Sequence, residues 1–277
     1  MRLTEPADLK PFLLRHGIRA EKGLGQHFLV SARVVDSIAL ALDGCVGLLE
    51  IGPGPGVLTA PLSARAERMI ALEIDPRMEA ALAESAPRAE VRRVDALKSD
   101  LSEILRELPE PRAIVSNLPY YITGPLLERI EAARGSFSKA VLMMQREVGT
   151  KILAEPGDRS RGSLSVNLQA NFATRMVCLA PAGAFLPPPK VDSIVLEFVS
   201  RPTSFDPFLT RLVRMAFAQP RKTLLNNLLT GQFGERAQLE AILVEIGERP
   251  DIRPQFLTEQ KWRELGARLG QLAARSE

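Results

Sequence analysis

Short apolar segments alternate with amphipathic segments over residues 1–200. The apolar segments end at glycine or polar residues, as strands buried in a parallel sheet do. The amphipathic segments repeat apolar residues every three or four positions, which is typical of helices with one buried face. The predicted strands are 46–51, 69–75, 91–94, 113–116, 140–144, 176–179 and 194–199. The predicted helices are 5–16, 31–42, 78–86 and 163–171.

The pattern changes after Arg201-Pro202. Further helices are predicted at 207–218, 223–229, 238–246 and 258–274, and no strand signal recurs between them. An α/β region followed by a helical region indicates two domains. We therefore predict a Rossmann-like α/β domain over residues 1–200 and a small all-helical domain over residues 201–277.

The segment Leu48–Gly56 joins a buried strand to a helix through a turn of glycine and proline. Gly52, Gly54 and Gly56 suit a turn that needs positive φ angles or a closely approaching ligand. A strand, a glycine turn and a helix form the first unit of a doubly wound nucleotide-binding sheet. However, the glycine spacing differs from that of dinucleotide enzymes, and Glu50 would repel a pyrophosphate. The segment therefore disfavours a nicotinamide dehydrogenase and favours a cationic ligand such as S-adenosylmethionine.

Polar residues directly follow successive predicted strands. Glu73, Asp95 and Asn117 stand at or just past the ends of three of them. In open α/β sheets, ligands bind at the carboxyl edge of the strands. Glu73 lies 21 residues after Gly52, close to the spacing at which an acid binds a ribose diol. We therefore expect these side chains to meet at one ligand site.

The segment Asn117–Tyr120, Asn-Leu-Pro-Tyr, is the most specific in the chain. Such a segment at a strand end is typical of enzymes that methylate a planar exocyclic amine. The N6 lone pair of adenine is delocalised into the ring. Two acceptors on its hydrogens, Asn117 Oδ1 and the Leu118 carbonyl, would direct the lone pair at a methyl group. Pro119 fixes the turn that presents this carbonyl, and Tyr120 would stack on the target base.

The composition is ordinary for a soluble globular protein of 277 residues, with 45% apolar and 25% charged residues. No segment approaches 18 uninterrupted apolar residues, and the first residues lack the apolar region of a signal peptide. Cys45 and Cys178 lie far apart and have no metal-ligand partners nearby. We therefore expect a cytoplasmic protein with no metal and no membrane attachment.

The whole excess of positive charge lies in the last 78 residues, and the first 29 residues are also mildly basic, with 5 basic and 3 acidic residues. Residues 1–199 hold 24 basic and 24 acidic residues, whereas residues 200–277 hold 12 and 9. Arg221 and Lys222 precede a predicted helix, where the helix macrodipole disfavours cations. These observations suggest a polyanionic partner, although a solvated surface explains so small an excess equally well.

The sequence resembles the KsgA (RsmA) family of small-subunit rRNA adenine dimethyltransferases over about residues 20–270. The matching motifs, in the family's order, are Gly23–Leu29, Glu50–Gly54, Asn117–Tyr120, Phe185–Ser193 and Arg221–Thr223. The resemblance implies a class I S-adenosylmethionine-dependent methyltransferase fold with a helical C-terminal domain. It also implies transfer of two methyl groups to N6 of each of two adjacent adenosines near the 3′ end of 16S rRNA. The implied partner is the immature small ribosomal subunit, and we expect a monomer.

Matching positions assign a role to individual residues. The resemblance implies cofactor contacts from His27, Leu29, Gly52, Glu73, Asp95 and Asn117, with Glu73 on the ribose and Asp95 on the adenine amine. It implies that the target base is held by Asn117, Leu118 and Tyr120, with Phe185 as a second aromatic wall. It implies RNA contacts from Arg221 and Lys222.

Two positions depart from the family's pattern. His27 stands where the family usually has Asn, and we expect its ring to be neutral because a charge would oppose a nearby sulfonium. Pro220 interrupts the usual Gln-Arg-Arg-Lys run and removes one cation. These departures leave room for a second hypothesis, a small-subunit assembly factor that is largely non-catalytic. Among enzymes, a 23S rRNA adenine methylase of the antibiotic-resistance type is the alternative, because it shares the methylation motifs.

Overall fold

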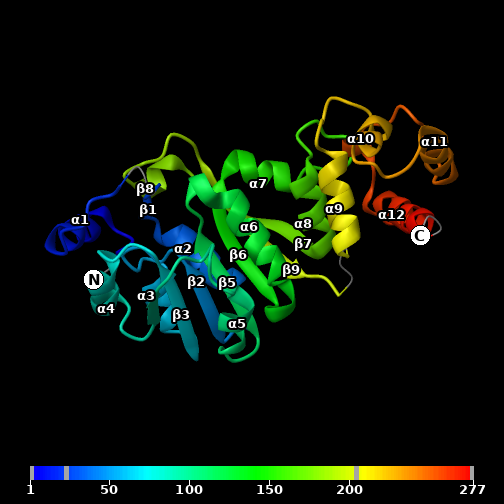
Figure 1. Cartoon of the computed structure of the whole chain (residues 1–277). Helices are drawn as coiled ribbons and strands as arrows, with labels where there is room; N and C mark the ends of the chain where they lie inside the picture. Colours follow the sequence, from blue (N-terminus) through cyan, green and yellow to red (C-terminus); the bar gives the residue numbers. More distant parts are fainter. Residues whose placement is uncertain (1–2, 22–24, 203–205, 275–277) are drawn as a thin grey trace. The chain divides into compact units, whose positions relative to one another are not determined.

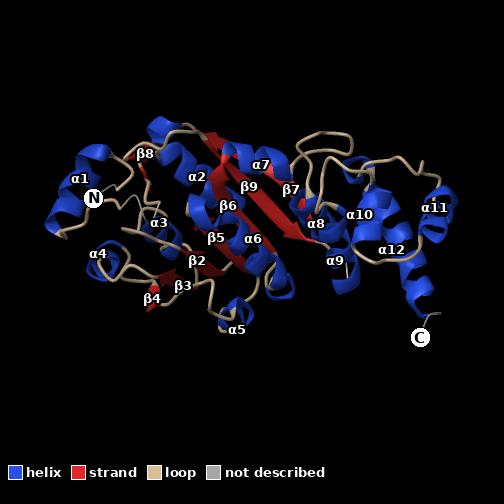
Figure 2. Cartoon of the chain, turned by 45° about the horizontal axis from the view of Figure 1, so that its top comes forward, coloured by secondary structure: helices blue, strands red, loops and turns tan. Residues whose placement is uncertain are grey.

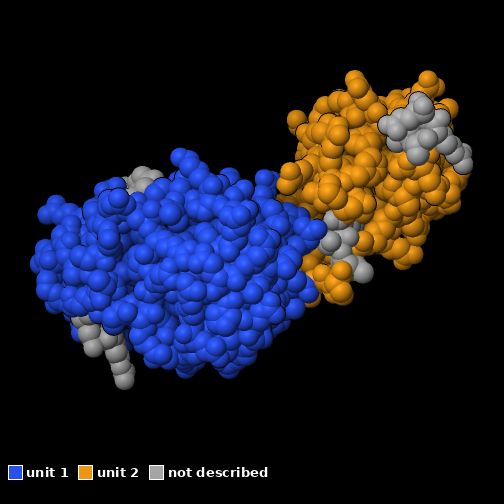
Figure 3. Space-filling model, turned by 60° about the horizontal axis from the view of Figure 1, so that its bottom comes forward, with its two compact units in different colours: residues 1–149, 174–200 blue, residues 150–173, 201–277 orange. Residues whose placement is uncertain are grey.

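The computed structural model describes residues 3–21, 25–202 and 206–274. The chain divides into two compact units (Figure 3). The first unit comprises residues 1–149 and 174–200, and the second comprises residues 150–173 and 201–277.

A seven-stranded sheet organises the first unit (Figure 1). Its strands, in chain order, are β2 (Gly47–Ile51), β3 (Arg68–Glu73), β4 (Glu90–Arg93), β5 (Arg112–Asn117), β6 (Lys139–Gln145), β7 (Phe172–Ala180) and β9 (Ser193–Ser200). They lie in the order β4-β3-β2-β5-β6-β9-β7. The strands from β4 to β6 are parallel, and β9 is antiparallel to β6. The chain leaves β2 toward β3 on one side and returns to β5 on the other, so β2 and β5 flank the switch point where ligands bind in such sheets.

Helices cover both faces of this sheet (Figure 2). The helices from α1 to α7 are α1 (Pro6–Arg15), α2 (Ala32–Ala41), α3 (Thr59–Ser63), α4 (Met78–Ser85), α5 (Leu101–Arg106), α6 (Thr123–Ala132) and α7 (Arg146–Ile152). On one face, Val35 and Ile38 of α2 share a buried cluster with Leu48, Met69 and Val141 of β2, β3 and β6. The Rossmann-like prediction for the first part of the chain is therefore confirmed.

The predicted strands are all present, but three helices of the first unit were not predicted. The helix α6 begins with Thr123, Gly124 and Pro125, and glycine and proline are more typical of turns. Proline is nevertheless tolerated in the first turn of a helix, where the backbone N–H has no intrahelical acceptor. In α7, Gly149 weakened the helical pattern. A Cβ at Gly149 would meet Ile194 Cγ2 at 2.2 Å, so glycine is required there because the helix lies against β9. The third helix, α5, has only six residues.

A second, two-stranded sheet joins segments that are distant in the sequence. β1 (Phe28–Leu29) pairs antiparallel with β8 (Phe185–Leu186). Leu29 lies opposite Phe185, and Phe28 opposite Leu186. Two-residue strands carry no periodicity, so this pairing could not be predicted. It brings the end of the Gly23–Leu29 motif (the N-terminal motif) beside the start of the Phe185–Ser193 motif (the proline-rich motif).

The second unit has its own hydrophobic core. Its helices are α8 (Ser163–Asn171), α9 (Pro207–Ala216), α10 (Leu224–Thr230), α11 (Arg236–Glu245) and α12 (Glu259–Ala274). We predicted a continuous first domain over residues 1–200, but residues 150–173 belong to the second unit. The reason is that Val166 and Ala170 of α8 are buried in one cluster with Leu212 and Trp262.

Candidate active site

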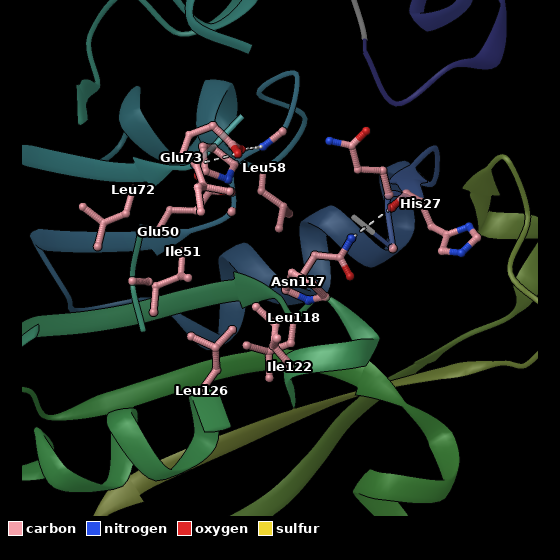
Figure 4. A pocket seen from close by; sticks show the side chains of 18 of the residues that line it. His27, Glu50, Ile51, Leu58, Leu72, Glu73, Asn117, Leu118, Ile122 and Leu126 are labelled. Atoms are coloured by element: carbon pink, nitrogen blue, oxygen red, sulfur yellow. Dashed lines mark hydrogen bonds between the residues drawn. The ribbon is translucent and has the colours of Figure 1, made fainter. Parts of the chain in front are cut away.

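A cavity of about 300 Å³ opens at the carboxyl edge of the first unit's sheet (Figure 4). Its lining comes from the loop around β1, the glycine turn after β2, the ends of β3 and β4, and the segment from β5 into α6. Most residues with a predicted cofactor or base contact line it, namely His27, Leu29, Gly52, Glu73, Asp95, Asn117, Leu118 and Tyr120. The structure thus brings the glycine turn and the Asn-Leu-Pro-Tyr segment into one site.

The glycine turn approaches Glu73 through its backbone. Gly52 and Gly54 have φ angles of +71° and +56°, which side-chain-bearing residues rarely adopt. In this conformation the Gly54 amide donates to Glu73 Oε2 at 3.0 Å. Glycine is therefore needed here for the shape of the turn that forms one wall of the cavity.

Glu73 is nearly buried and is held by backbone amides. Its Oε1 accepts from the Ile74 and Asp75 amides at 2.9 and 2.8 Å, in addition to the Gly54 bond on Oε2. Burial raises the pKa of this carboxyl, against the lowering effect of the three backbone donors. A carboxylate has about four acceptor positions, so the carboxylate that is fixed here retains capacity for a ligand hydroxyl.

Glu50 is a second acid in the lining and is 1% exposed. Its Oε2 is buried and has no hydrogen-bond partner within the described part of the chain. Burial, opposed by the Thr59 hydroxyl and assisted by the nearby Glu73, raises the pKa of Glu50 to about 8. A buried carboxyl oxygen without a donor is costly, so this end of the cavity favours a ligand that brings positive charge.

Asn117, the last residue of β5, is oriented by the N-terminal motif. Its Nδ2 donates to the main-chain oxygen of His27 at 3.1 Å (dashed in Figure 4). A carbonyl oxygen only accepts, so the amide nitrogen must face His27 and Oδ1 lies on the opposite side of the amide. The next residue, Leu118, is buried, and its amide donates to Met143 O at 2.9 Å. The backbone at Leu118, whose carbonyl is the second predicted acceptor, is therefore attached to β6.

Tyr120 begins a short 3-10 turn that follows Pro119. Pro119 O accepts from the Ile122 amide and from Thr123 Oγ1, both at 3.1 Å, which closes the turn. The Tyr120 ring is half-buried at the cavity, and burial raises the pKa of its hydroxyl. This side chain is thus a neutral aromatic surface beside Asn117.

Asp95 and Leu29 complete the predicted cofactor set. Asp95 is half-buried after β4, and its Oδ1 accepts from the Leu97 amide at 2.9 Å. Leu29 is buried in β1, opposite Phe185. Both line the cavity. Gly23 and Leu24 of the N-terminal motif lie outside the described residues.

Three predicted residues do not line the cavity. Phe185 was expected to be a second aromatic wall, but it is 3% exposed and belongs to the large buried cluster of the first unit. The pairing of β8 with β1 accounts for this burial, so the structure does not place Phe185 against a target base. Arg221 and Lys222 are exposed residues of the second unit, ahead of α10.

A polar network beside the cavity was missed at the sequence level. Gln26 Nε2 donates to Asp75 Oδ2 at 2.8 Å, and Arg77 binds the same carboxylate. The Arg77 guanidinium holds the pKa of Asp75 below its usual range. Arg77 also pairs with Glu21 at 2.7 Å. These residues connect the N-terminal loop to the end of β3, and their separation in sequence left no local signal.

The described part of the chain contains neither a metal-binding cluster nor a membrane-spanning helix. There, no group of three or more His, Cys, Asp or Glu side chains gathers as a metal site would require. Among the described helices, none combines the length and apolar character that crossing a membrane requires.

Comparison with known proteins gives one consistent result. The family model for ribosomal RNA adenine dimethylase matches residues 17–252. A ribosomal RNA small subunit methyltransferase A from Streptococcus uberis is 35% identical, covering 94% of this chain and 93% of the relative. The protein of the same name from Streptococcus pyogenes serotype M1 is 36% identical, covering 96% and 97%.

Two solved structures share both the fold and part of the sequence. A dimethyladenosine transferase from Plasmodium falciparum has a TM-score of 0.76 at 26% identity, covering 89% of this chain and 98% of that one. The 23S rRNA methyltransferase ErmE has a TM-score of 0.67 at 26% identity, covering 88% and 100%.

Proposed function

Because the chain belongs to the ribosomal RNA adenine dimethylase family, we propose that it transfers methyl groups from S-adenosylmethionine to N6 of two adjacent adenosines near the 3′ end of 16S rRNA. The observation that carries the proposal is the arrangement of Asn117. Its amide is oriented by the His27 main chain, and it stands in the same cavity as Glu50 and Glu73. One cavity thus combines two acids that suit a cationic cofactor with an amide oxygen that can accept from the target amine.

The residues present fit S-adenosylmethionine. The unpartnered Glu50 oxygen suits a cationic group, and Glu73 has acceptor capacity for ribose hydroxyls. Asp95 would accept from the adenine amine, while Gly52 and Leu29 shape the wall. When bound, this cofactor supplies an electrophilic methyl group on a positively charged sulfur. The acids and the glycine turn therefore form the proposed cofactor end of the cavity.

At the other end, the chain's own groups act on the target amine. In the first transfer, Asn117 Oδ1 and the Leu118 carbonyl would each accept one N6 hydrogen. In the second transfer the monomethylated nitrogen has one hydrogen left, which one of these two oxygens would accept. This arrangement draws the nitrogen toward a tetrahedral geometry and aims its lone pair away from the two acceptors. Fixed dipoles of this kind need no reorganisation during the reaction, so positioning and electrostatics supply the rate enhancement. No strong general base is required, because the newly methylated nitrogen carries a positive charge and readily gives its proton to water.

Tyr120 would stack on the target adenine. Stacking on an aromatic side chain stabilises a bound base by roughly 1–3 kcal/mol. This offsets part of the few kcal/mol needed to take a base out of its stack. The half-buried ring beside Asn117 supports this role.

The test is mass spectrometry of rRNA fragments after incubation of the full chain with S-adenosylmethionine and immature small subunits. We expect two adjacent adenosines, each gaining two methyl groups. Subunits without added mass on any adenosine would reject the proposal. We also propose that the enzyme is a monomer and that it binds the immature subunit in the cytoplasm. Light scattering of the purified enzyme tests whether it is a monomer.

A 23S rRNA substrate is the second candidate, because the chain also shares its fold with a 23S rRNA methyltransferase. The relatives named small subunit methyltransferase A, which match nearly the whole chain, favour the small subunit. Offering 23S rRNA and immature small subunits in parallel distinguishes the two. A labelled adenosine in 23S rRNA alone would favour the second candidate. Assembly defects that a catalytically dead variant still corrects would favour an assembly factor.

A further inference from the structure

The Tyr120 ring is held at two places by residues distant in the sequence. Its Oη lies 2.6 Å from Ser193 Oγ. The His27 ring stacks on it, with ring centroids 5.7 Å apart and planes inclined by 26°. The contact with Ser193 fixes the position of the Tyr120 hydroxyl, and the stacked His27 ring fixes the plane of the Tyr120 ring. Together the two contacts leave the ring little freedom.

Ser193 is attached to the same sheet that carries Asn117. It is the first residue of β9, is 0% exposed, and lies opposite Gln145 at the end of β6. Asn117 lies opposite Met143 of the same strand β6. The distance between the Ser193 hydroxyl and the Asn117 backbone is therefore set by strand pairing. The Ser193 hydroxyl is therefore a hydrogen-bond partner of fixed position for Tyr120.

His27 contacts both Asn117 and Tyr120, the two side chains proposed to hold the target base. Its Nδ1 lies 2.8 Å from Pro187 O. Since that carbonyl only accepts, Nδ1 carries a proton. The main-chain oxygen of His27 accepts from Asn117 Nδ2, while its ring faces Tyr120. The pairing of β1 with β8 keeps Pro187 within reach. One residue thus orients the acceptor and the aromatic platform together.

We propose that Ser193 and His27 are positioning residues that hold the Tyr120 ring, so that a stacked adenine presents N6 to Asn117. This inference rests on the proposed function, in which Tyr120 stacks on the target base. It explains what the last residue of the proline-rich motif does, although Phe185 of the same motif is buried. Since a misplacement of about 1 Å can cost about 100-fold in rate, small shifts of this ring should be visible in kcat.

The first experiment is a double-mutant cycle with Ser193→Ala and Tyr120→Phe, assayed on immature small subunits. We expect each variant to lower kcat by about 10- to 100-fold, with the dissociation constant of S-adenosylmethionine unchanged. The double variant should be no worse than the poorer single variant, because both changes remove one hydroxyl contact. An unchanged kcat for Ser193→Ala, or additive losses, would overturn the assignment of Ser193.

The ring of His27 is tested by His27→Phe against His27→Ala. Both variants keep the main-chain oxygen that binds Asn117, but only phenylalanine keeps a ring against Tyr120. We expect the alanine variant to lose about tenfold or more in kcat. The phenylalanine variant should lose less, because it keeps the stacked ring although it lacks the donor to Pro187 O. Wild-type kcat in the alanine variant would refute the assignment of His27.

Fluorine NMR detects changes in the environment of the Tyr120 ring in the absence of RNA. The chain has two tyrosines, Tyr120 and Tyr121, so 3-fluorotyrosine labelling gives two signals, assigned with Tyr121→Phe. Ser193→Ala should shift or broaden the Tyr120 signal and leave that of Tyr121, which is 57% exposed, in place. An unmoved Tyr120 signal contradicts the positioning role, and full methylation by Tyr120→Ala contradicts the stacking of Tyr120 on the target base. A wild-type enzyme that adds no methyl group to the subunits contradicts the proposed function itself.

Discussion

The two ends of the cavity are built in different ways. At the cofactor end, Glu73 is held by amides of its own turn and of the neighbouring glycine turn, each within 20 residues in the chain. At the target end, Asn117 and Tyr120 depend on His27 and Ser193, which lie 90 and 73 residues away. The cofactor end is therefore a local product of two strand ends. The target end depends on the whole first unit being folded, so changes at the two ends should have separable effects.

The largest effect should come from the acceptor at the target end. Asn117→Ala removes the oxygen that would bind N6, and we expect kcat to fall about 100- to 1,000-fold, as for loss of one oxyanion-type contact. Cofactor affinity should change only a few-fold. Radiolabel transfer to immature subunits and calorimetry measure the two quantities. Gln260→Ala, which truncates an exposed carboxamide on α12, is the matched control. Wild-type kcat for Asn117→Ala would contradict the mechanism.

At the cofactor end, Glu73→Ala should weaken binding first. The change removes the acceptor proposed for the ribose hydroxyls, and a hydrogen bond to a charged group contributes about 1.5–3 kcal/mol. We expect the dissociation constant of S-adenosylmethionine to rise about 10- to 100-fold. Titration calorimetry checks this value, with the exposed Glu79→Ala as control. If both variants bind equally well, Glu73 does not contact the cofactor.

Glu50 should make cofactor binding depend on pH. With its pKa near 8, the free enzyme carries a proton there at neutral pH. A bound cation favours the carboxylate, so binding releases a proton and affinity rises with pH, by at most about tenfold per unit, until about pH 8. Calorimetry in buffers of different ionisation enthalpy measures the proton. Glu50→Gln should abolish its release, and a wild-type enzyme that releases none would count against this role.

The same group should affect folding stability in the opposite direction. Its pKa is raised from 4.5 in the unfolded chain to about 8 in the folded one. The folded state therefore binds more protons between these values, and the contribution of Glu50 to stability falls as pH rises from about 4.5 to about 8. Chemical unfolding across this range should show a shallower pH dependence for Glu50→Gln than for wild type.

The smallest effect should come from the second unit. Arg221 and Lys222 are both exposed, so both are available to phosphates. Replacing either by Ala should weaken subunit binding a few-fold and lower the salt dependence by about one phosphate contact. Arg249→Ala, in which the lost cation is one already paired with Asp251, is the control. Equal salt slopes for all variants would show that these cations do not contact RNA.

Sequence patterns predicted much of this architecture because its strands are apolar runs that end at polar residues. Glu73, Asp95 and Asn117 met in one cavity because parallel strands share their carboxyl edge. The contact between Tyr120 and Ser193 left no such signal, since it depends on where the antiparallel β9 inserts. The burial of Phe185 likewise follows from two-residue strands, and α8 joined the second unit because of which core its apolar face meets.

A structure of the enzyme with S-adenosylhomocysteine and an adenosine-containing RNA tests the central claim most directly. The account predicts that N6 of the target adenine lies within hydrogen-bonding distance of Asn117 Oδ1 and the Leu118 carbonyl, with the cofactor's sulfur on the side that the lone pair faces. An adenine whose N6 contacts neither oxygen, or a sulfur bound away from Glu50 and Glu73, would contradict it.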